Sequence, residues 1–156
     1  MMKIYQGNIS KESLSLFVSD IGSRLLGGNM RPLEISFGGI EKLSIIPDFD
    51  FYNLNLVLGL SLQRENMGRA VDTYKVTLEM LYESEQSAFE VVLGFTGVRR
   101  LAVPDVCGSL YLSEVEVDDV SADQLEGVKY SLKDYGGTGF EVLAREFSVV
   151  SCKQHL

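Results

Sequence analysis

Hydrophobic and polar positions alternate with a period of two over most of the chain beyond residue 50. The pattern is strictest in Leu54–Leu62, where every second residue is a leucine and Asn55, Gly59 and Ser61 stand between them. Successive side chains of a strand point to opposite faces of its sheet. The alternation therefore predicts a half-buried strand. Its leucines share one face: Leu54, Leu56, Leu58, Leu60 and Leu62.

Four further runs alternate in the same way and are arranged as two hairpins. Asp72–Tyr82 and Phe89–Phe95 are separated by the polar stretch ESEQS, which predicts an antiparallel pair with a five-residue loop. Val128–Asp134 and Phe140–Val150 flank the sequence YGGTG, whose glycines can supply the positive φ angles of a turn. Further strands are expected at Lys3–Gln6, Leu33–Phe37, Lys42–Ile46, Arg99–Val103 and Ser109–Val117.

One segment near the N-terminus has a helical period instead. Ser10 suits the N-cap of a helix, Glu12 favours the positive end of the helix dipole, and Gly27–Gly28 would end the helix. Its apolar residues form one stripe, at Leu14, Phe17, Val18, Ile21 and Leu25. Many short strands, tight turns and a single helix predict the α+β class, mainly β. We expect an antiparallel curled sheet or sandwich with this one N-terminal helix over an opening or face.

Length and composition fit one ordinary globular domain spanning residues 1–156, with 46% hydrophobic and 23% charged residues. No apolar run approaches the ~18 residues that a membrane span requires. The N-terminal sequence MMKIYQGNIS lacks the apolar core of a signal peptide, which predicts a cytoplasmic protein. The net charge of -8 argues against nucleic-acid binding, because that needs a basic surface.

The negative charge is concentrated in one part of the chain. Residues 101–128 contain seven Asp and Glu side chains and no Lys or Arg. On the predicted strand Ser109–Val117, Tyr111, Val115 and Val117 are expected to face one way, with the acidic residues facing the other. With those of the following loop, these acids form a candidate protein-binding surface: Glu114, Glu116, Asp118, Asp119, Asp123 and Glu126.

Two interpretations of these acidic residues stay open. An exposed strand edge can carry charge only to prevent aggregation, with Lys129 and Lys133 neutralising part of it after folding. A dense acidic patch can also speed the encounter with a basic protein and select it over other partners. Calcium fits less well, because DDVSADQLE does not match the alternating acids and glycine of a calcium loop. We therefore predict no metal site.

Catalytic groups are scarce in the sequence. The one histidine, His155, stands one residue from the end of the sequence, where chains usually fray, so it is poorly placed as a base for a nucleophile. Cys107 and Cys152 have neither a metal-binding nor a disulfide spacing, which favours reduced, inert thiols. The stretches GSRLLGG and YGGTG lack the lysine of a phosphate loop. The sequence predicts a protein that is not an enzyme and uses no cofactor.

The stretch GVRRLAV…LYLSEVEVDDV…DQLEGVKYSLKDY…GFEVLAREFSVV, within residues 97–150, resembles immunity proteins encoded beside polymorphic toxins. It is also similar to uncharacterised bacterial families of like length. The resemblance covers about a third of the chain, depends on spaced apolar and acidic positions, and assigns a role to no residue. The resemblance implies a non-catalytic, cytoplasmic protein that binds a toxin. It also implies that acidic groups of this protein occupy the basic active site of a toxin that is a nuclease.

Two alternatives come from the predicted sheet. A curled sheet can enclose a small-ligand cavity, for which Leu54–Leu62, Tyr74, Phe89 and Phe95 are the candidate lining residues. A homo-oligomer can instead form by pairing of exposed sheet edges.

Overall fold

The computed structural model describes residues 35–65 and 73–155, which belong to one compact unit. The predicted strand Lys3–Gln6 and the predicted helix that starts after Ser10 lie outside the described residues. The assignment of residues 1–156 to a single domain stays a prediction.

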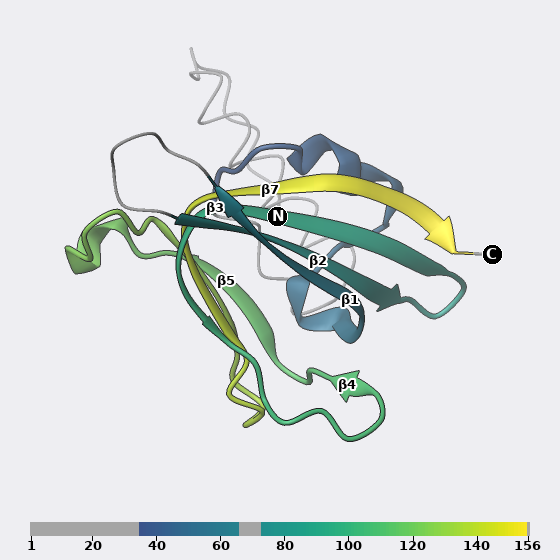
Figure 1. The fold of residues 1–156 in the computed structure, drawn as a ribbon. Coiled ribbons are helices and arrows are strands. Elements are labelled where there is room, and N and C mark those ends of the chain that lie inside the picture. Colours follow the sequence, from purple (N-terminus) through teal and green to yellow (C-terminus); the bar gives the residue numbers. More distant parts are fainter. Residues whose placement is uncertain (1–34, 66–72, 156) are drawn as a thin grey trace, which may run out of the picture. The chain divides into compact units, whose positions relative to one another are not determined.

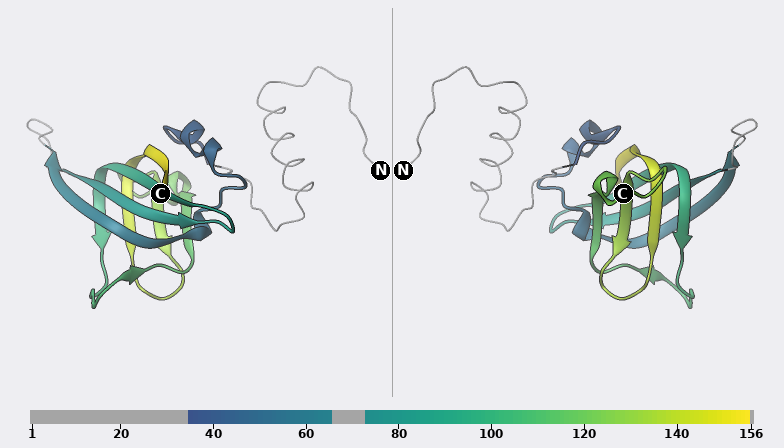
Figure 2. Two further views of the ribbon diagram at one scale, coloured as in Figure 1. Left: turned by 90° about the vertical axis from the view of Figure 1, so that its right-hand side faces the viewer. Right: turned by 90° about the vertical axis from the view of Figure 1, so that its left-hand side faces the viewer.

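Seven antiparallel strands form one curled sheet in the order β4-β1-β2-β3-β7-β6-β5 (Figure 1). The strands are β1 (Leu54–Glu65), β2 (Thr73–Glu83), β3 (Ala88–Ala102), β4 (Leu110–Tyr111), β5 (Val115–Asp119), β6 (Tyr130–Asp134) and β7 (Glu141–His155). Three short 3₁₀ helices accompany them: η1 (Ile40–Ile45), η2 (Phe51–Asn53) and η3 (Ser121–Asp123). The strong curvature of β1 and β2 across the remaining strands is visible in the side views (Figure 2). The predicted mainly β class with a curled antiparallel sheet is confirmed.

Both predicted hairpins are present. β2 and β3 pair in register from Glu83 and Ala88 onwards, and the turn is closed by the Ser84 amide donating to the Ser87 carbonyl oxygen at 2.9 Å. β6 and β7 pair across the turn YGGTG, in which Gly137 has a φ of 97° and Gly139 a φ of 79°. Only glycine adopts such angles without strain.

The predicted strand Lys42–Ile46 is wrong, because this segment forms the 3₁₀ helix η1. Leu43 and Ile46 are both 3% exposed, and their spacing of three residues matches one turn of a 3₁₀ helix. The Lys42 ammonium fixes the helix to β7 by donating to the carbonyl oxygens of Val149 and Val150, at 3.2 and 3.0 Å. Within the predicted strand Leu33–Phe37, the described residues 35–37 are not a strand either.

Two other predicted strands have different bounds. Residues Arg99–Ala102, predicted as the start of a separate strand, continue β3, which also contains Phe89–Phe95. The predicted strand Ser109–Val117 is divided into β4 and β5. Tyr111 on β4 is 61% exposed, so the expectation that it shares an inward face with Val115 is wrong.

The leucines of β1 do not share one face, because the pairing of β1 with β2 is irregular at two places. Leu54 lies opposite Tyr82, but Leu56 lies opposite Leu81, the next residue of β2 and therefore on the other face. A second shift between Val57 and Gly59 restores the inward direction further along, so that Leu60 lies opposite Leu78. Each shift reverses which residues face the core.

The core is an aromatic cluster between the inner face of the sheet and the segment 36–53. Phe147 of β7 lies at its centre, with ring-centroid distances of 4.8 Å to Phe37, 5.0 Å to Phe95, and 6.0 Å to both Phe51 and Tyr130. All five rings are less than 9% exposed. The segment preceding β1 therefore supplies two of the five rings of this cluster, although it contains no strand.

Substitution of Gly39 by alanine is expected to destabilise the protein by about 2–3 kcal/mol. Gly39 has a φ of 75°, and a Cβ atom there would overlap the carbonyl oxygen of Val149. Gly108 is the matched control, since its φ is 86° but a Cβ atom would meet nothing within 4 Å. Gly108→Ala should cost only the backbone strain, about 1–2 kcal/mol. Urea unfolding of both variants measures the difference, and equal losses would contradict the close packing of Gly39 on β7.

Candidate functional site

The acidic surface predicted from the sequence begins on β5, the outermost strand beyond β6 (Figure 1). Val115 and Val117 are buried, with exposures of 0% and 9%, whereas Glu116 and Asp118 take the alternate positions and are partly exposed. The predicted division of this strand into an apolar inner and an acidic outer side is confirmed for these four residues.

The other acidic candidates flank β5. Glu114 directly precedes the strand and is partly exposed, and its carbonyl oxygen accepts from the Tyr135 amide at 2.9 Å. Asp119 ends the strand, and Asp123 and Glu126 lie in the loop between β5 and β6; all three are exposed. The six predicted residues therefore lie along β5 and in the segments directly before and after it.

Asp119 organises the start of this loop. Its Oδ1 accepts from the Ser121 amide at 2.9 Å and from the Ser121 hydroxyl. These bonds to Ser121, aided by the charge of Lys129, hold the pKa of Asp119 below its usual value. Asp119 thus stays ionised in mildly acidic solution, and its negative charge is fixed at the end of β5.

Cations lie beside the acidic surface. Lys133 of β6 is directly opposite Glu116, and Lys129 acts on Asp119. The Lys129 and Lys133 ammonium groups each lie 5.2 Å from a ring centroid, those of Tyr130 and Tyr135. Both lysines named as neutralising candidates in the sequence are therefore close to acidic residues, so part of the negative charge is compensated within the protein.

Negative charge nevertheless predominates around Tyr135, which follows β6. Burial, and then the carboxylates of Asp118, Glu116 and Glu141, raise the pKa of the Tyr135 phenol above its usual value. Three carboxylates from two different strands act on this one group even though Lys133 lies over its ring.

Asp134 supports this arrangement and was not singled out from the sequence. Its carboxylate is 2% exposed and accepts from four donors: the amides of Ser113, Glu114 and Gly136 at 3.2, 2.9 and 3.0 Å, and the Thr138 hydroxyl at 2.6 Å. Burial opposes ionisation, but the hydrogen bonds outweigh it and keep the pKa of Asp134 below its usual value. A signal existed, because an Asp that precedes a glycine-rich turn commonly accepts from the turn amides.

A smaller hollow of about 420 Å³ adjoins Glu126. It is lined by Arg99 and Arg100 of β3 together with Leu125, Glu126, Val128 and Leu143. The Arg99 guanidinium lies close to Gly127, whose φ of 69° would disfavour any side chain there. The far end of the acidic loop is therefore bordered by arginine.

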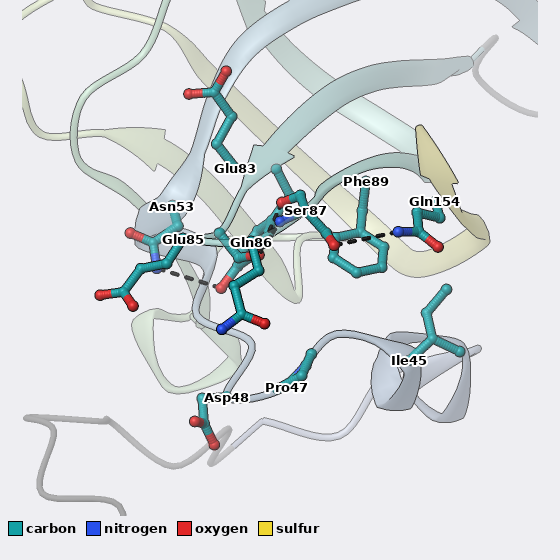
Figure 3. Close-up of a pocket in the computed structure, with 12 residues that line it drawn as sticks. Ile45, Pro47, Asp48, Asn53, Glu83, Glu85, Gln86, Ser87, Phe89 and Gln154 are labelled. Carbon is teal, nitrogen blue, oxygen red and sulfur yellow. Dashed lines mark hydrogen bonds between the residues drawn. The ribbon is translucent and has the colours of Figure 1, made fainter. Parts of the chain in front are cut away.

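A larger hollow lies at another place, between the β2–β3 turn and the segment Ile45–Asp48 (Figure 3). It measures about 960 Å³ and is open to solvent on one side. Some of its polar groups are bonded to one another: Asn53 Nδ2 donates to the Tyr82 hydroxyl at 3.3 Å, and Gln154 Nε2 donates to Ser87 Oγ at 3.2 Å (Figure 3). Of the residues expected from the sequence to line a cavity, Phe89 alone borders this hollow.

The remaining candidate chemistry is dispersed. His155 ends β7 and is exposed, Cys107 is exposed in the loop before β4, and burial raises the pKa of the partly exposed Cys152. Within residues 35–65 and 73–155, no three His, Cys, Asp or Glu side chains lie close enough together to hold a metal ion. None of the helices in these ranges is long and apolar enough to cross a membrane.

The fold and this surface define a mainly β protein with an acidic sheet edge. No protein-family model matches the chain, no curated protein is detectably similar to it, and no solved structure matches its fold.

Proposed function

We propose that this chain is a non-catalytic binding protein that receives a basic protein partner on the acidic surface formed by β5 and the β5–β6 loop. The observation that carries the proposal is the placement of all six predicted acids on the outermost strand and its adjoining loop. A surface at a sheet edge is accessible to a large partner, and its field both speeds encounter and rejects acidic surfaces.

The nearby lysines are compatible with this role. An interface needs a pattern of charge that only the right partner matches, and alternating signs give such a pattern better than uniform charge. Glu116 opposite Lys133, and Asp119 near Lys129, would fix the orientation of the partner. The more exposed Asp123 and Glu126 would supply the attraction at long range.

The identity of the partner is a finer proposal that depends on the resemblance described above. We infer that the partner is a toxin. This chain would then act as its cytoplasmic immunity protein and cover the basic active site of the toxin. The acidic surface supports this class of partner because such a site is built to bind nucleic-acid phosphates.

A second candidate function is the binding of a small ligand in the 960 Å³ hollow. Its volume lies within the ~300–1,000 Å³ range of ligand sites. Eight of the twelve residues that line it are polar or charged, whereas ligand sites are mostly apolar. We therefore place this function second.

Charge reversal at Asp123 and Glu126 tests the proposed function. The double variant Asp123→Lys, Glu126→Lys changes two exposed residues of the loop and should weaken partner binding about tenfold. The matched control is Glu83→Lys, Glu85→Lys, which shifts the net charge equally at the β2–β3 turn. The three full-length proteins are immobilised and exposed to extract from the cells that make the protein, and retained proteins are identified by mass spectrometry.

We expect basic proteins that are retained by the wild type and the control but not by the loop variant. If all three proteins retain the same set, the acidic surface is not the binding site. Retention that is lost equally in both variants would show a dependence on net charge alone and would also reject the proposal.

A further inference from the structure

The sheet edge at the other end of the strand order, formed by β4 and β1, differs sharply from the edge formed by β5. β4 pairs with the outer side of β1 only at Leu56 and Val57, and the Leu112 amide donates to Asn55 beside them. Among the described residues, no strand pairs with the outer side of β1 from Leu58 to Gln63. An unpaired run of this length is a ready template for another strand.

The unpaired edge is also apolar. Leu58, Leu60 and Leu62 are 43%, 38% and 55% exposed, and no charged residue occurs from Leu58 to Gln63. Natural edge strands normally carry a charge or a proline at such positions to prevent pairing. β5 follows that rule, whereas β1 lacks the protection over six consecutive residues.

We propose that this edge pairs with the same edge of a second copy of the chain, joining the two sheets through antiparallel β1 strands about a two-fold axis at Ser61. Strand pairing must end where β4 begins, so it is confined to the stretch after Val57. The symmetric pair centred on Ser61 uses Gly59–Gln63 in both copies. Ser61 then lies opposite Ser61 of the second copy, and Leu60 lies opposite Leu62.

This register keeps the inner faces of the two sheets on the same side of the joined sheet. A two-fold axis perpendicular to the sheet leaves inward residues inward, so that Leu60 and Leu62 of both copies form one four-leucine cluster. Leu60 and Leu62 lie opposite Leu78 and Val76 of β2, both fully buried, so the new cluster would extend the existing apolar face.

Charge complementarity on the opposite face favours a second copy as the occupant. Glu79 of β2 lies over Gly59, because a Cβ atom at Gly59 would be 2.8 Å from Glu79 Oε2. Lys75 of β2 is paired with Gln63. In the proposed register Gly59 lies opposite Gln63 of the second copy. The Glu79 carboxylate therefore lies over the edge strand of one copy, on the same face of the joined sheet as Lys75 of the second copy, and the symmetry produces this juxtaposition of opposite charges twice.

The basic partner proposed for β5 would find no comparable attraction here. The edge residues Leu58–Gln63 carry no charge, and the Glu79 carboxylate over Gly59 shares the outer face of the sheet with Lys75. The inference is independent of the proposed function, since the two surfaces lie on opposite edges of the sheet order.

Sedimentation equilibrium of the full-length chain over a range of concentrations tests the assembly. We expect a reversible dimer whose dissociation constant rises by about 100-fold in Leu60→Lys and in Leu62→Lys. Val106→Lys is the matched control, since Val106 is 55% exposed like Leu62 but lies in the loop before β4; its dimer should be unchanged. Circular dichroism confirms that each variant is folded. A wild type that is monomeric at every concentration, or dimers insensitive to both leucine substitutions, would overturn the proposal.

The register has its own test in a Cys107→Ser background. Ser61→Cys should form an intermolecular disulfide under mild oxidation, because directly opposite Cβ atoms lie about 5 Å apart. Gln63→Cys should not form a disulfide, because residue 63 lies opposite Gly59 of the second copy, four residues from residue 63 of that copy. Lys75→Glu and Glu79→Lys should each weaken the dimer, and the double variant should restore it. Cross-linking at residue 63 rather than 61, or no restoration, would overturn the register.

Discussion

Replacement of Asp134 by alanine is expected to lower the free energy of unfolding by about 3–5 kcal/mol. Four donors lose their acceptor at once, and an unsatisfied buried donor costs about 1–3 kcal/mol. Two of these donors, the Ser113 and Glu114 amides, belong to the bend that separates β4 from β5. The acidic surface should therefore lose its position along with part of the stability. Equilibrium unfolding in urea gives the magnitude.

The same residue should make stability depend on pH. The pKa of Asp134 is lower in the folded protein than in the unfolded chain, so its stabilisation is complete above the unfolded pKa of about 4. It is lost as the pH falls through the lower folded pKa. The wild type should lose stability below about pH 4 more steeply than Asp134→Ala. Asp119→Ala is the control, because Asp119 is exposed and bonds only to its own loop. A large loss in that control, or identical acid profiles for wild type and Asp134→Ala, would contradict this role.

Replacement of Phe147 by alanine should be similarly damaging, with a loss of about 3–5 kcal/mol. The substitution leaves a cavity at the point where rings from β3, β6 and the segment 36–53 meet. The surrounding strands are tied by backbone hydrogen bonds and can collapse only partly into the space.

Tyr111→Ala provides the control for the loss of an aromatic ring, since Tyr111 is 61% exposed and should change stability by less than about 1 kcal/mol. The free energies of unfolding of the two variants are obtained by chemical denaturation. They can be compared when the free energy depends on denaturant concentration with the same slope in both variants. If Phe147→Ala cost no more than Tyr111→Ala, the aromatic cluster would not be the centre of the core.

Alternation of apolar residues was sufficient to locate most strands. In Val76–Tyr82 the inward residues Val76, Leu78, Met80 and Tyr82 are all at most 2% exposed, as a period of two requires. Tyr74, which the same period places inward, is 43% exposed, and the pairing of β2 with β3 shifts between Tyr74 and Val76. The same rule gave a wrong prediction for β1. Two irregularities in its pairing with β2 change which residues face the core, and the alternation in the sequence does not indicate them. The rule also gave a wrong prediction for Lys42–Ile46, where a contact with β7 distant in the sequence stabilises a 3₁₀ helix.

The acidic residues could be found from the sequence because their charge is local, and their outward direction follows from Val115 and Val117 between them. Lys129 and Lys133 could be named from the sequence as neutralising candidates, but the acid that each one meets could not, since Lys133 reaches Glu116 only through the pairing of β5 with β6. Asp134 was missed for the same reason: two of its donors, Ser113 and Glu114, are about twenty residues away. Such contacts between residues far apart in the sequence form only in the folded sheet, so a local stretch of sequence does not predict them.

The central claim is that the strand Val115–Asp119 and the loop up to Glu126 form the face that accepts positive charge from another protein. Titration of the ¹⁵N-labelled chain with an oligolysine peptide at low salt tests that claim residue by residue through amide chemical shifts. Shifts concentrated between Glu114 and Gly127 and suppressed by added salt are the predicted result. Shifts centred instead on the Glu83–Ser87 turn, or spread evenly over every exposed carboxylate, would contradict it.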